Sequence, residues 1–256
     1  MNDKIFIKNR NDLKILVKPH ILPGSQKLVF IEHGLSGSSN EAHIKEMEKA
    51  FSILGYSTVL FDATNSTGDS DLSKEGITFT SHYHDLIDVI DWAKTQPFFV
   101  SPFALTGHSI GGTAVTLYAE EHPDDVHLLI PIAPSPSGTS LENSRKTRDL
   151  VDFEAWKKNG FYDKTSQTTG KTLHIPFSFL EDMRHYDLMP LAHKIKCKTV
   201  IIIGNKEDSS RLSDVNLFYE KLMCPKAFIL LPDTPHVPTP DNMPAFILAL
   251  NQAIKD

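Results

Sequence analysis

The chain has only two cysteines in 256 residues, Cys197 and Cys224, and no CxxC pair. Two thiols cannot build a disulfide framework, and this spacing does not indicate a metal or redox site. Long apolar runs are also missing, because no stretch approaches the roughly 18 consecutive apolar residues of a membrane span. The first residues alternate charged and apolar positions and lack the apolar core of a signal peptide. We therefore expect a cytoplasmic protein with no membrane partner.

Clusters of basic residues are absent as well. Lys and Arg total 26 against 32 Asp and Glu, which gives a formal net charge of −6, and the positive residues stand singly. A nucleic acid or an anionic membrane surface favours a clustered positive patch. We expect neither of these partners, and the sequence leaves the oligomeric state open.

Short apolar runs alternate with segments of helical periodicity. The runs predict eight strands, at Lys4–Lys8, Leu13–Lys18, Lys27–His33, Tyr56–Ala63, Phe103–Gly107, His127–Ala133, Lys198–Gly204 and Ala227–Pro232. Several are apolar at nearly every position, which is typical of strands covered on both faces of a parallel sheet. The first two runs alternate and flank a turn-rich cluster, so they favour an antiparallel hairpin at the sheet's edge.

Apolar residues recur at three- and four-residue spacing between these runs. They predict helices that begin near His43, Tyr83, Ala114, Leu217 and Phe246. This alternation favours one α/β domain over residues 1–256, with helices on both faces of a mostly parallel eight-stranded sheet. Residues 135–197 break the rhythm, because a βα connection usually takes about two to six residues. We expect this segment, inserted after the sixth strand, to form a small lid.

The stretch FALTGHSIGG contains a GxSxG pattern between a predicted strand and a predicted helix. A serine at a sharp strand-to-helix turn needs strained backbone angles, and small neighbours such as Gly107 and Gly111 avoid collisions there. Ser109 is therefore the candidate nucleophile. Ile110 begins the expected helix, and its amide is expected to face any oxyanion formed at Ser109. The turn His33-Gly34-Leu35 follows the third strand and can present the Leu35 amide as a second donor.

A serine nucleophile needs a base and a group that orients it. Among twelve histidines, His236 follows the last strand, at the sheet edge where ligand-facing residues gather. Glu207 and Asp208 both follow the seventh strand, and only one of them can point at His236. His82 and His84 form a weak HxH pattern, and we expect both to face solvent.

HGLSGS, GHSIGG, an acid after the seventh strand and a histidine after the eighth resemble the α/β-hydrolase superfamily. More narrowly, the chain is similar to bacterial cinnamoyl/feruloyl-esterase-like and serine-aminopeptidase-like hydrolases, from about Ile5 to Ile254. The resemblance implies an α/β-hydrolase fold, a lid at about residues 135–187, and catalytic roles for Ser109 and His236. It also implies an oxyanion hole made by the Leu35 and Ile110 amides.

The triad acid departs from the family pattern. Relatives usually place it three residues after the strand's glycine, which here is Glu207, whereas Asp208 is fourth. Asp is the commoner residue in that role, and Asp-Ser-Ser resembles the residues after the acid in relatives. We therefore favour Asp208 over Glu207 as the third catalytic residue.

The sequence thus predicts a serine esterase that hydrolyses a small acyl or aryl ester and needs no metal or organic cofactor. A thioesterase or an aminopeptidase could use the same residues. An aminopeptidase would need a lid carboxylate for the substrate ammonium, and the candidates are Glu142, Glu154, Glu181 and Asp182. A hydrolase-fold protein that only binds its ligand is the alternative from another class.

Overall fold

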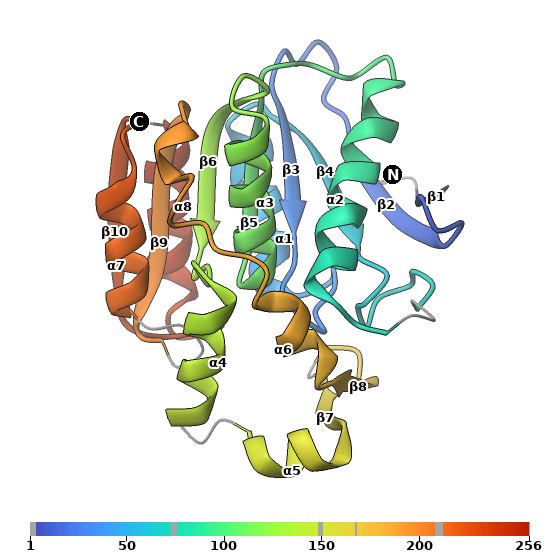
Figure 1. Cartoon of the computed structure of the whole chain (residues 1–256). Coiled ribbons are helices and arrows are strands. Elements are labelled where there is room, and N and C mark those ends of the chain that lie inside the picture. Colours follow the sequence, from blue (N-terminus) through green and yellow to red (C-terminus); the bar gives the residue numbers. More distant parts are fainter. Residues whose placement is uncertain (1–3, 73–75, 148–150, 167, 208–211, 256) are drawn as a thin grey trace.

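The computed structural model describes residues 4–72, 76–147, 151–166, 168–207 and 212–255, and eight of its strands form one sheet (Figure 1). The order is β1-β2-β4-β3-β5-β6-β9-β10. These strands are β1 (Ile5–Lys8), β2 (Lys14–His20), β3 (Leu28–Glu32), β4 (Ser57–Asp62), β5 (Phe103–His108), β6 (Val126–Ile132), β9 (Lys198–Lys206) and β10 (Lys226–Pro235). β2 pairs antiparallel with β1 and β4, and all other neighbours are parallel. The predicted sheet and its edge hairpin are confirmed.

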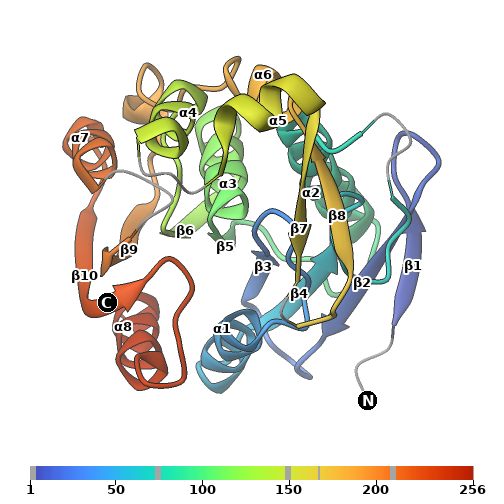
Figure 2. The same ribbon diagram turned by 90° about the horizontal axis from the view of Figure 1, so that it is seen from below.

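Helices cover both faces of this sheet (Figure 2). α1 (Ala42–Ile53) and α8 (Met243–Lys255) lie on one face, and α2 (Phe79–Lys94), α3 (Ile110–Glu121) and α7 (Leu212–Lys221) lie on the other. Strand side chains alternate between two apolar cores: in β3, Phe30 joins one, and Val29 and Ile31 join the other. Burial on both faces explains why the strands read as unbroken apolar runs. In the part of the chain that the structure describes, no helix has the length and apolarity to cross a membrane.

The segment between β6 and β9 folds at the carboxyl end of the sheet (Figure 1). It contains α4 (Gly138–Thr147), α5 (Phe153–Asn159), a separate hairpin of β7 (Phe161–Thr165) and β8 (Thr172–Pro176), α6 (Ser178–Met183) and the 3₁₀ helix Ala192–Lys194. Its two ends are tied together, because the Gly138 amide donates to the Tyr186 carbonyl and the Leu188 amide donates to the Pro136 carbonyl. We call residues 135–187 the insertion.

The hairpin β7–β8 was not predicted from the sequence. Its inner side chains Leu173 and Ile175 are buried, and the indole of Trp156 donates to the Ile175 carbonyl at 3.0 Å. The apolar Phe161, by contrast, is 46% exposed. Because this exposed position is apolar, the strand lacks the alternation of apolar and polar residues by which a half-buried strand is predicted.

Close backbone contact between β5, α3 and the loop after β3 depends on two glycines. A Cβ on Gly107 would lie 2.5 Å from the carbonyl carbon and oxygen of Gly111. A Cβ on Gly111 would lie 2.4 Å from the His33 carbonyl oxygen. These contacts are with backbone atoms that cannot rotate away, so a side chain at either position would push the three segments apart.

We expect Gly107→Ala to lower the free energy of unfolding by about 3 kcal/mol or more, because the added methyl overlaps fixed backbone. Gly55→Ala is the matched control. Gly55 has a φ of 85° and nothing within 4 Å of the added carbon, so its replacement should cost only about 1–2 kcal/mol for the left-handed backbone. Denaturant unfolding of both variants measures the difference, and equal losses would contradict the steric account.

Candidate active site

Ser109 stands between β5 and α3 with φ 58° and ψ −123°, a strained conformation for any residue except glycine. Hydrogen bonds hold it there, since its amide donates to the Ile132 carbonyl and its carbonyl accepts from the Thr113 amide. A serine at a helix N-cap usually accepts a bond from the first turn. Ser109 makes no such side-chain bond. Its hydroxyl is therefore available for another partner.

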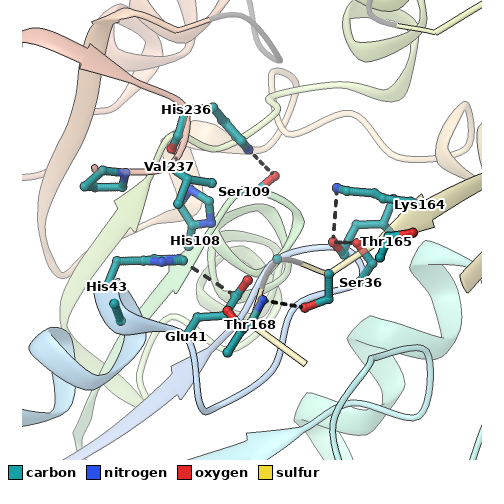
Figure 3. Close-up of a pocket in the computed structure, with 15 residues that line it drawn as sticks. Ser36, Glu41, His43, His108, Ser109, Lys164, Thr165, Thr168, His236 and Val237 are labelled. Atoms are coloured by element: carbon teal, nitrogen blue, oxygen red, sulfur yellow. Dashed lines mark hydrogen bonds and ion pairs between the residues drawn. The ribbon is translucent and has the colours of Figure 1, made fainter. Parts of the chain in front are cut away.

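That partner is His236, in the loop after β10 (Figure 3). His236 Nε2 lies 2.9 Å from Ser109 Oγ, and His236 Nδ1 lies 2.8 Å from Glu207 Oε2. A carboxylate accepts, so we assign the ring proton to Nδ1, which leaves Nε2 to accept from the serine hydroxyl. The side chain of Glu207 is only 1% exposed, and that of His236 is 16% exposed. The three groups form one hydrogen-bonded line that ends at the serine oxygen.

The register of the last two strands brings the acid and the imidazole together. Lys206 in β9 is paired with Pro235 in β10, so the next residue of each strand, Glu207 and His236, leaves the sheet at the same level. Gly204 allows this approach, because a Cβ there would lie 2.0 Å from the Thr234 carbonyl oxygen. The position of the carboxylate is thus a consequence of strand pairing.

The sequence preference for Asp208 needs correction at this point. Asp208 lies outside the described residues, and the carboxylate that contacts the imidazole belongs to Glu207, the alternative left open by the sequence. A third position after Gly204 is also where relatives of the predicted family place the acid. Glu207 therefore replaces Asp208 as our candidate for the third residue.

The two amides predicted to bind an oxyanion lie close to the serine. Leu35 and Ser109 line the same cavity, and a Cβ on Gly34 would be 3.1 Å from Ser109 Cβ, so the loop after β3 passes directly over the serine. Ile110 is the first residue of α3, where a helix leaves its amides unpaired. Among the described residues, neither amide donates to a backbone or side-chain acceptor. Both remain candidates for binding a negative oxygen.

Buried histidines hold this loop in place. His33 Nε2 accepts from the Ala63 amide, and His33 Nδ1 donates to the Gly34 carbonyl. His82 Nε2 lies 3.1 Å from the His33 carbonyl oxygen and 3.0 Å from Glu32 Oε1. Burial lowers the pKa of His33, lowers the pKa of His82 to about 4, and raises the pKa of Glu32 well above its usual value. The expectation that His82 faces solvent is wrong, whereas His84 is partly exposed.

A cavity of about 310 Å³ opens at Ser109. It is lined by the loop after β3, the start of α1, the turn between β5 and α3 that carries Ser109 (the elbow), the hairpin β7–β8 and the loop after β10. The lining residues are Gly34, Leu35, Ser36, Glu41, Ala42, His43, His108, Ser109, Lys164, Thr165, Ser166, Thr168, His236, Val237 and Pro238. The sequence missed Glu41, His43 and Lys164. His43 begins an apolar helical face and was read there as core, and Lys164 lies in a hairpin that was not predicted.

Three imidazoles lie side by side along one wall of the cavity, with His43 edge-on to His108 and His108 tilted against His236. The ring centroids of His43 and His108 are 4.5 Å apart, and those of His108 and His236 are 4.7 Å apart. His108 Nε2 donates to the His236 carbonyl at 2.8 Å. Burial lowers the pKa of His43 to about 3 and lowers the pKa of His108 well below its usual value. Both rings are neutral at pH 7, so neither of them places a positive charge beside His236.

Among the described residues, no three His, Cys, Asp or Glu side chains gather in a way that could hold a metal ion. The chemistry that the arrangement supports is instead nucleophilic: a hydroxyl beside a base, two free amides, and an open cavity in front of them.

The chain is similar to several known proteins. The chain is 24% identical over 162 residues to homoserine O-acetyltransferase of Corynebacterium jeikeium, an alignment that covers 57% of this chain and 41% of that protein. It is 23% identical over 204 residues to the mitochondrial palmitoyl-protein thioesterase ABHD10 of Mus musculus, covering 78% of this chain and 65% of that protein. This chain thus spans less than two thirds of the length of these relatives.

Among solved structures, Est1E from Butyrivibrio proteoclasticus with bound ferulic acid is similar, with a TM-score of 0.79 and 20% identity over 98% of this chain and 97% of that one. At this identity the likeness establishes the fold alone. The model of the α/β-hydrolase fold family matches residues 27–178, which include β3, the elbow and much of the insertion. With the strand order, the strained serine and this match in agreement, the chain belongs to the α/β-hydrolase fold family.

Proposed function

We propose that this chain is a serine hydrolase that cleaves a small carboxylic ester through an acyl-enzyme intermediate. One observation carries the proposal: Ser109, His236 and Glu207 form a continuous line of hydrogen bonds at the floor of a cavity. Such a line makes a serine hydroxyl nucleophilic, because the imidazole accepts its proton and the carboxylate stabilises the resulting cation. The acetyltransferase and thioesterase named among the relatives also act on acyl groups, in keeping with this proposal.

In the first step, Ser109 Oγ attacks the ester carbonyl carbon while its proton moves to His236 Nε2. The carbonyl oxygen becomes an oxyanion beside the Leu35 and Ile110 amides, and loss of one such donor costs roughly 100- to 1,000-fold in rate. The tetrahedral intermediate then expels the alcohol, which takes the proton from His236. In the second step, His236 accepts a proton from water as the water oxygen attacks the acyl-serine carbonyl. The second tetrahedral intermediate then breaks its bond to Ser109 Oγ, which takes the proton back from His236 as the carboxylic acid is released.

The insertion acts in this scheme as the lid that shapes the substrate pocket. Its hairpin β7–β8 contributes Lys164 and Thr165 to the cavity wall opposite His236 (Figure 3). We propose the boundaries 135–187 for this lid, on the strength of the backbone bonds that join its two ends.

A thioester remains the second candidate substrate, because the same triad attacks both carbonyl types and a relative is named as a thioesterase. An aminopeptidase finds less support. In the lid, Glu142 is paired with Arg184 and Lys146, and Asp182 accepts from Thr80. Within the described part of the chain, none of the four lid carboxylates considered for this role lines the cavity at Ser109.

Replacement of Ser109 by alanine tests the nucleophile. We expect the purified protein to hydrolyse p-nitrophenyl acetate and Ser109→Ala to lower kcat/KM by on the order of 10⁴-fold or more, since no other group takes over the attack. Ser213→Ala, an exposed serine on α7, is the control and should keep full activity. Release of p-nitrophenol measures both rates. Equal activity of the two variants would remove the mechanism.

Replacement of the two neighbouring acids tests the third member. Glu207→Gln keeps the size of the side chain but loses the charge that stabilises protonated His236, so kcat should fall by roughly 10³- to 10⁴-fold. Asp208→Asn should change kcat by no more than about threefold, because in this account Glu207 alone stabilises the imidazole. Steady-state kinetics on the same ester compares them, and the reverse order of effects would restore Asp208 as the acid.

A protein that only binds its ligand is separated from an enzyme by an activity-based probe. A fluorophosphonate reacts with activated serines, so the wild-type protein should be labelled at Ser109 and Glu207→Gln should be labelled much more slowly. A folded wild-type protein that does not react would favour the binding protein.

A further inference from the structure

One buried polar atom in the cavity makes no hydrogen bond to the residues that the structure describes. This atom is His43 Nε2, although the side chain of His43 is only 2% exposed and lines the same cavity as Ser109. Leaving a buried polar atom unpaired costs about 1–3 kcal/mol. A ligand group that reaches this nitrogen would recover part of that free energy.

A carboxylate faces the same space. Glu41 Oε2 lies 4.0 Å from His43 Nε2, and Figure 3 shows the two side chains directed toward one another at one end of the cavity. This separation is too long for a direct hydrogen bond. Both residues line the cavity, and a ligand oxygen on the cavity side of the line that joins these two atoms can lie about 2.8 Å from each, an ordinary hydrogen-bond length. The two groups can therefore share a single polar atom of a ligand.

Gly37 allows the carboxylate to occupy this position. A Cβ on Gly37 would lie 2.5 Å from Glu41 Oε2 and 3.0 Å from the Gly34 carbonyl oxygen. Gly37 has no positive φ, so its backbone angles do not call for glycine. The Ser38 amide also donates to the Glu41 carboxylate. The loop after β3 thus holds the Glu41 carboxylate at the cavity wall.

The charges around this space favour a neutral group over a cation. Burial lowers the pKa of His43 to about 3, so its ring is neutral at pH 7 and can carry a proton on Nε2. Lys164 lies close enough to lower the pKa of Glu41, although burial keeps that pKa above its ordinary value. The ammonium of Lys164 thus balances the carboxylate. A hydroxyl suits both partners, because it accepts from the imidazole N–H and donates to the carboxylate.

We propose that Glu41 and His43 form a subsite for a hydroxyl group of the substrate, so that the preferred substrates are short hydroxylated esters. This proposal rests on the proposed function of Ser109. An alkyl chain of the same length would leave both polar groups unpaired, and polar sites of this kind discriminate strongly against analogues that lack the hydroxyl. The hydroxyl side chains of Thr165, Ser166 and Thr168 on the lid also disfavour a long alkyl chain.

The test compares esters that differ only in a hydroxyl. One panel holds methyl esters of hexanoic acids with a hydroxyl at each carbon from 2 to 6, and the other holds acetate monoesters of six-carbon diols, each beside its unsubstituted parent. We expect kcat/KM for at least one hydroxylated ester to exceed that of its parent by about tenfold or more, a typical value for one hydrogen-bonded group. Ratios of kcat/KM near one throughout both panels would overturn the subsite. A kcat/KM for methyl 6-aminohexanoate above that of every hydroxylated ester would overturn it as well.

Variants locate the effect in the two residues. Glu41→Leu and His43→Phe should bring the ratio close to one while hydrolysis of the parent esters persists. His43→Gln, whose amide can donate in place of the imidazole, should keep part of the preference. Glu46→Gln, on the outer side of α1 where Glu46 pairs with Lys49, is the control and should keep all of it. A ratio that survives both Glu41→Leu and His43→Phe would contradict the assignment.

A binding measurement separates the subsite from the catalytic proposal. In Ser109→Ala, which cannot turn the ester over, the ¹⁵N resonance of His43 Nε2 should shift when the preferred hydroxylated ester binds and stay in place with its parent. A wild-type enzyme that hydrolyses all esters without this preference would overturn the subsite alone. If no ester is hydrolysed and the fluorophosphonate does not react, the proposed function fails, and the resonance of His43, followed with each panel member, still decides the subsite.

Discussion

The site depends on how closely three pieces of backbone approach one another around Ser109. β5 ends at the elbow, α3 begins there, and the loop after β3 crosses both. The backbones lie so close together that positions 107 and 111 can hold only glycine. This crossing holds Ser109 at φ 58° and places the Leu35 loop against it. The roughly 1–3 kcal/mol of strain at such a residue is balanced by the packing of a fully buried sheet. The proposed nucleophile and the two amides proposed to bind the oxyanion are therefore positioned by the same contact.

A second constraint is electrostatic. The cavity places His43 and His108 beside His236, yet burial lowers the pKa of the first two, so they carry no charge that would oppose protonation of the third. Glu207, almost fully buried, supplies the one carboxylate bonded to His236 among the described residues. His33 and His82 are also neutral, and their hydrogen bonds hold the loop after β3 in place. Similar side chains thus have different tasks because their burial and partners differ.

Much of this arrangement was accessible from the sequence. Strands buried on both faces produce unbroken apolar runs, so the sheet was predicted correctly. A serine between glycines at a strand end pointed to Ser109, and the position after the last strand pointed to His236, whose Nε2 lies 2.9 Å from Ser109 Oγ. For the acid the sequence favoured Asp208, because Glu207 and Asp208 are neighbours and only the pairing of Lys206 with Pro235 decides which position faces the imidazole. The hairpin β7–β8 was missed because Phe161 is apolar but exposed. His43 was interpreted as a core residue, because the sequence does not distinguish a histidine packed in the core from one that lines a cavity.

The central claim is that Ser109, His236 and the two amides act on one carbonyl group. A crystal structure of the protein after reaction with a fluorophosphonate tests it most directly, since the phosphonyl group imitates the tetrahedral intermediate. The account predicts phosphorus bonded to Ser109 Oγ, its free oxygen at about 2.7–3.1 Å from the Leu35 and Ile110 amides, and His236 still bonded to Glu207. A phosphonyl oxygen directed away from both amides, or an adduct on another residue, would contradict it.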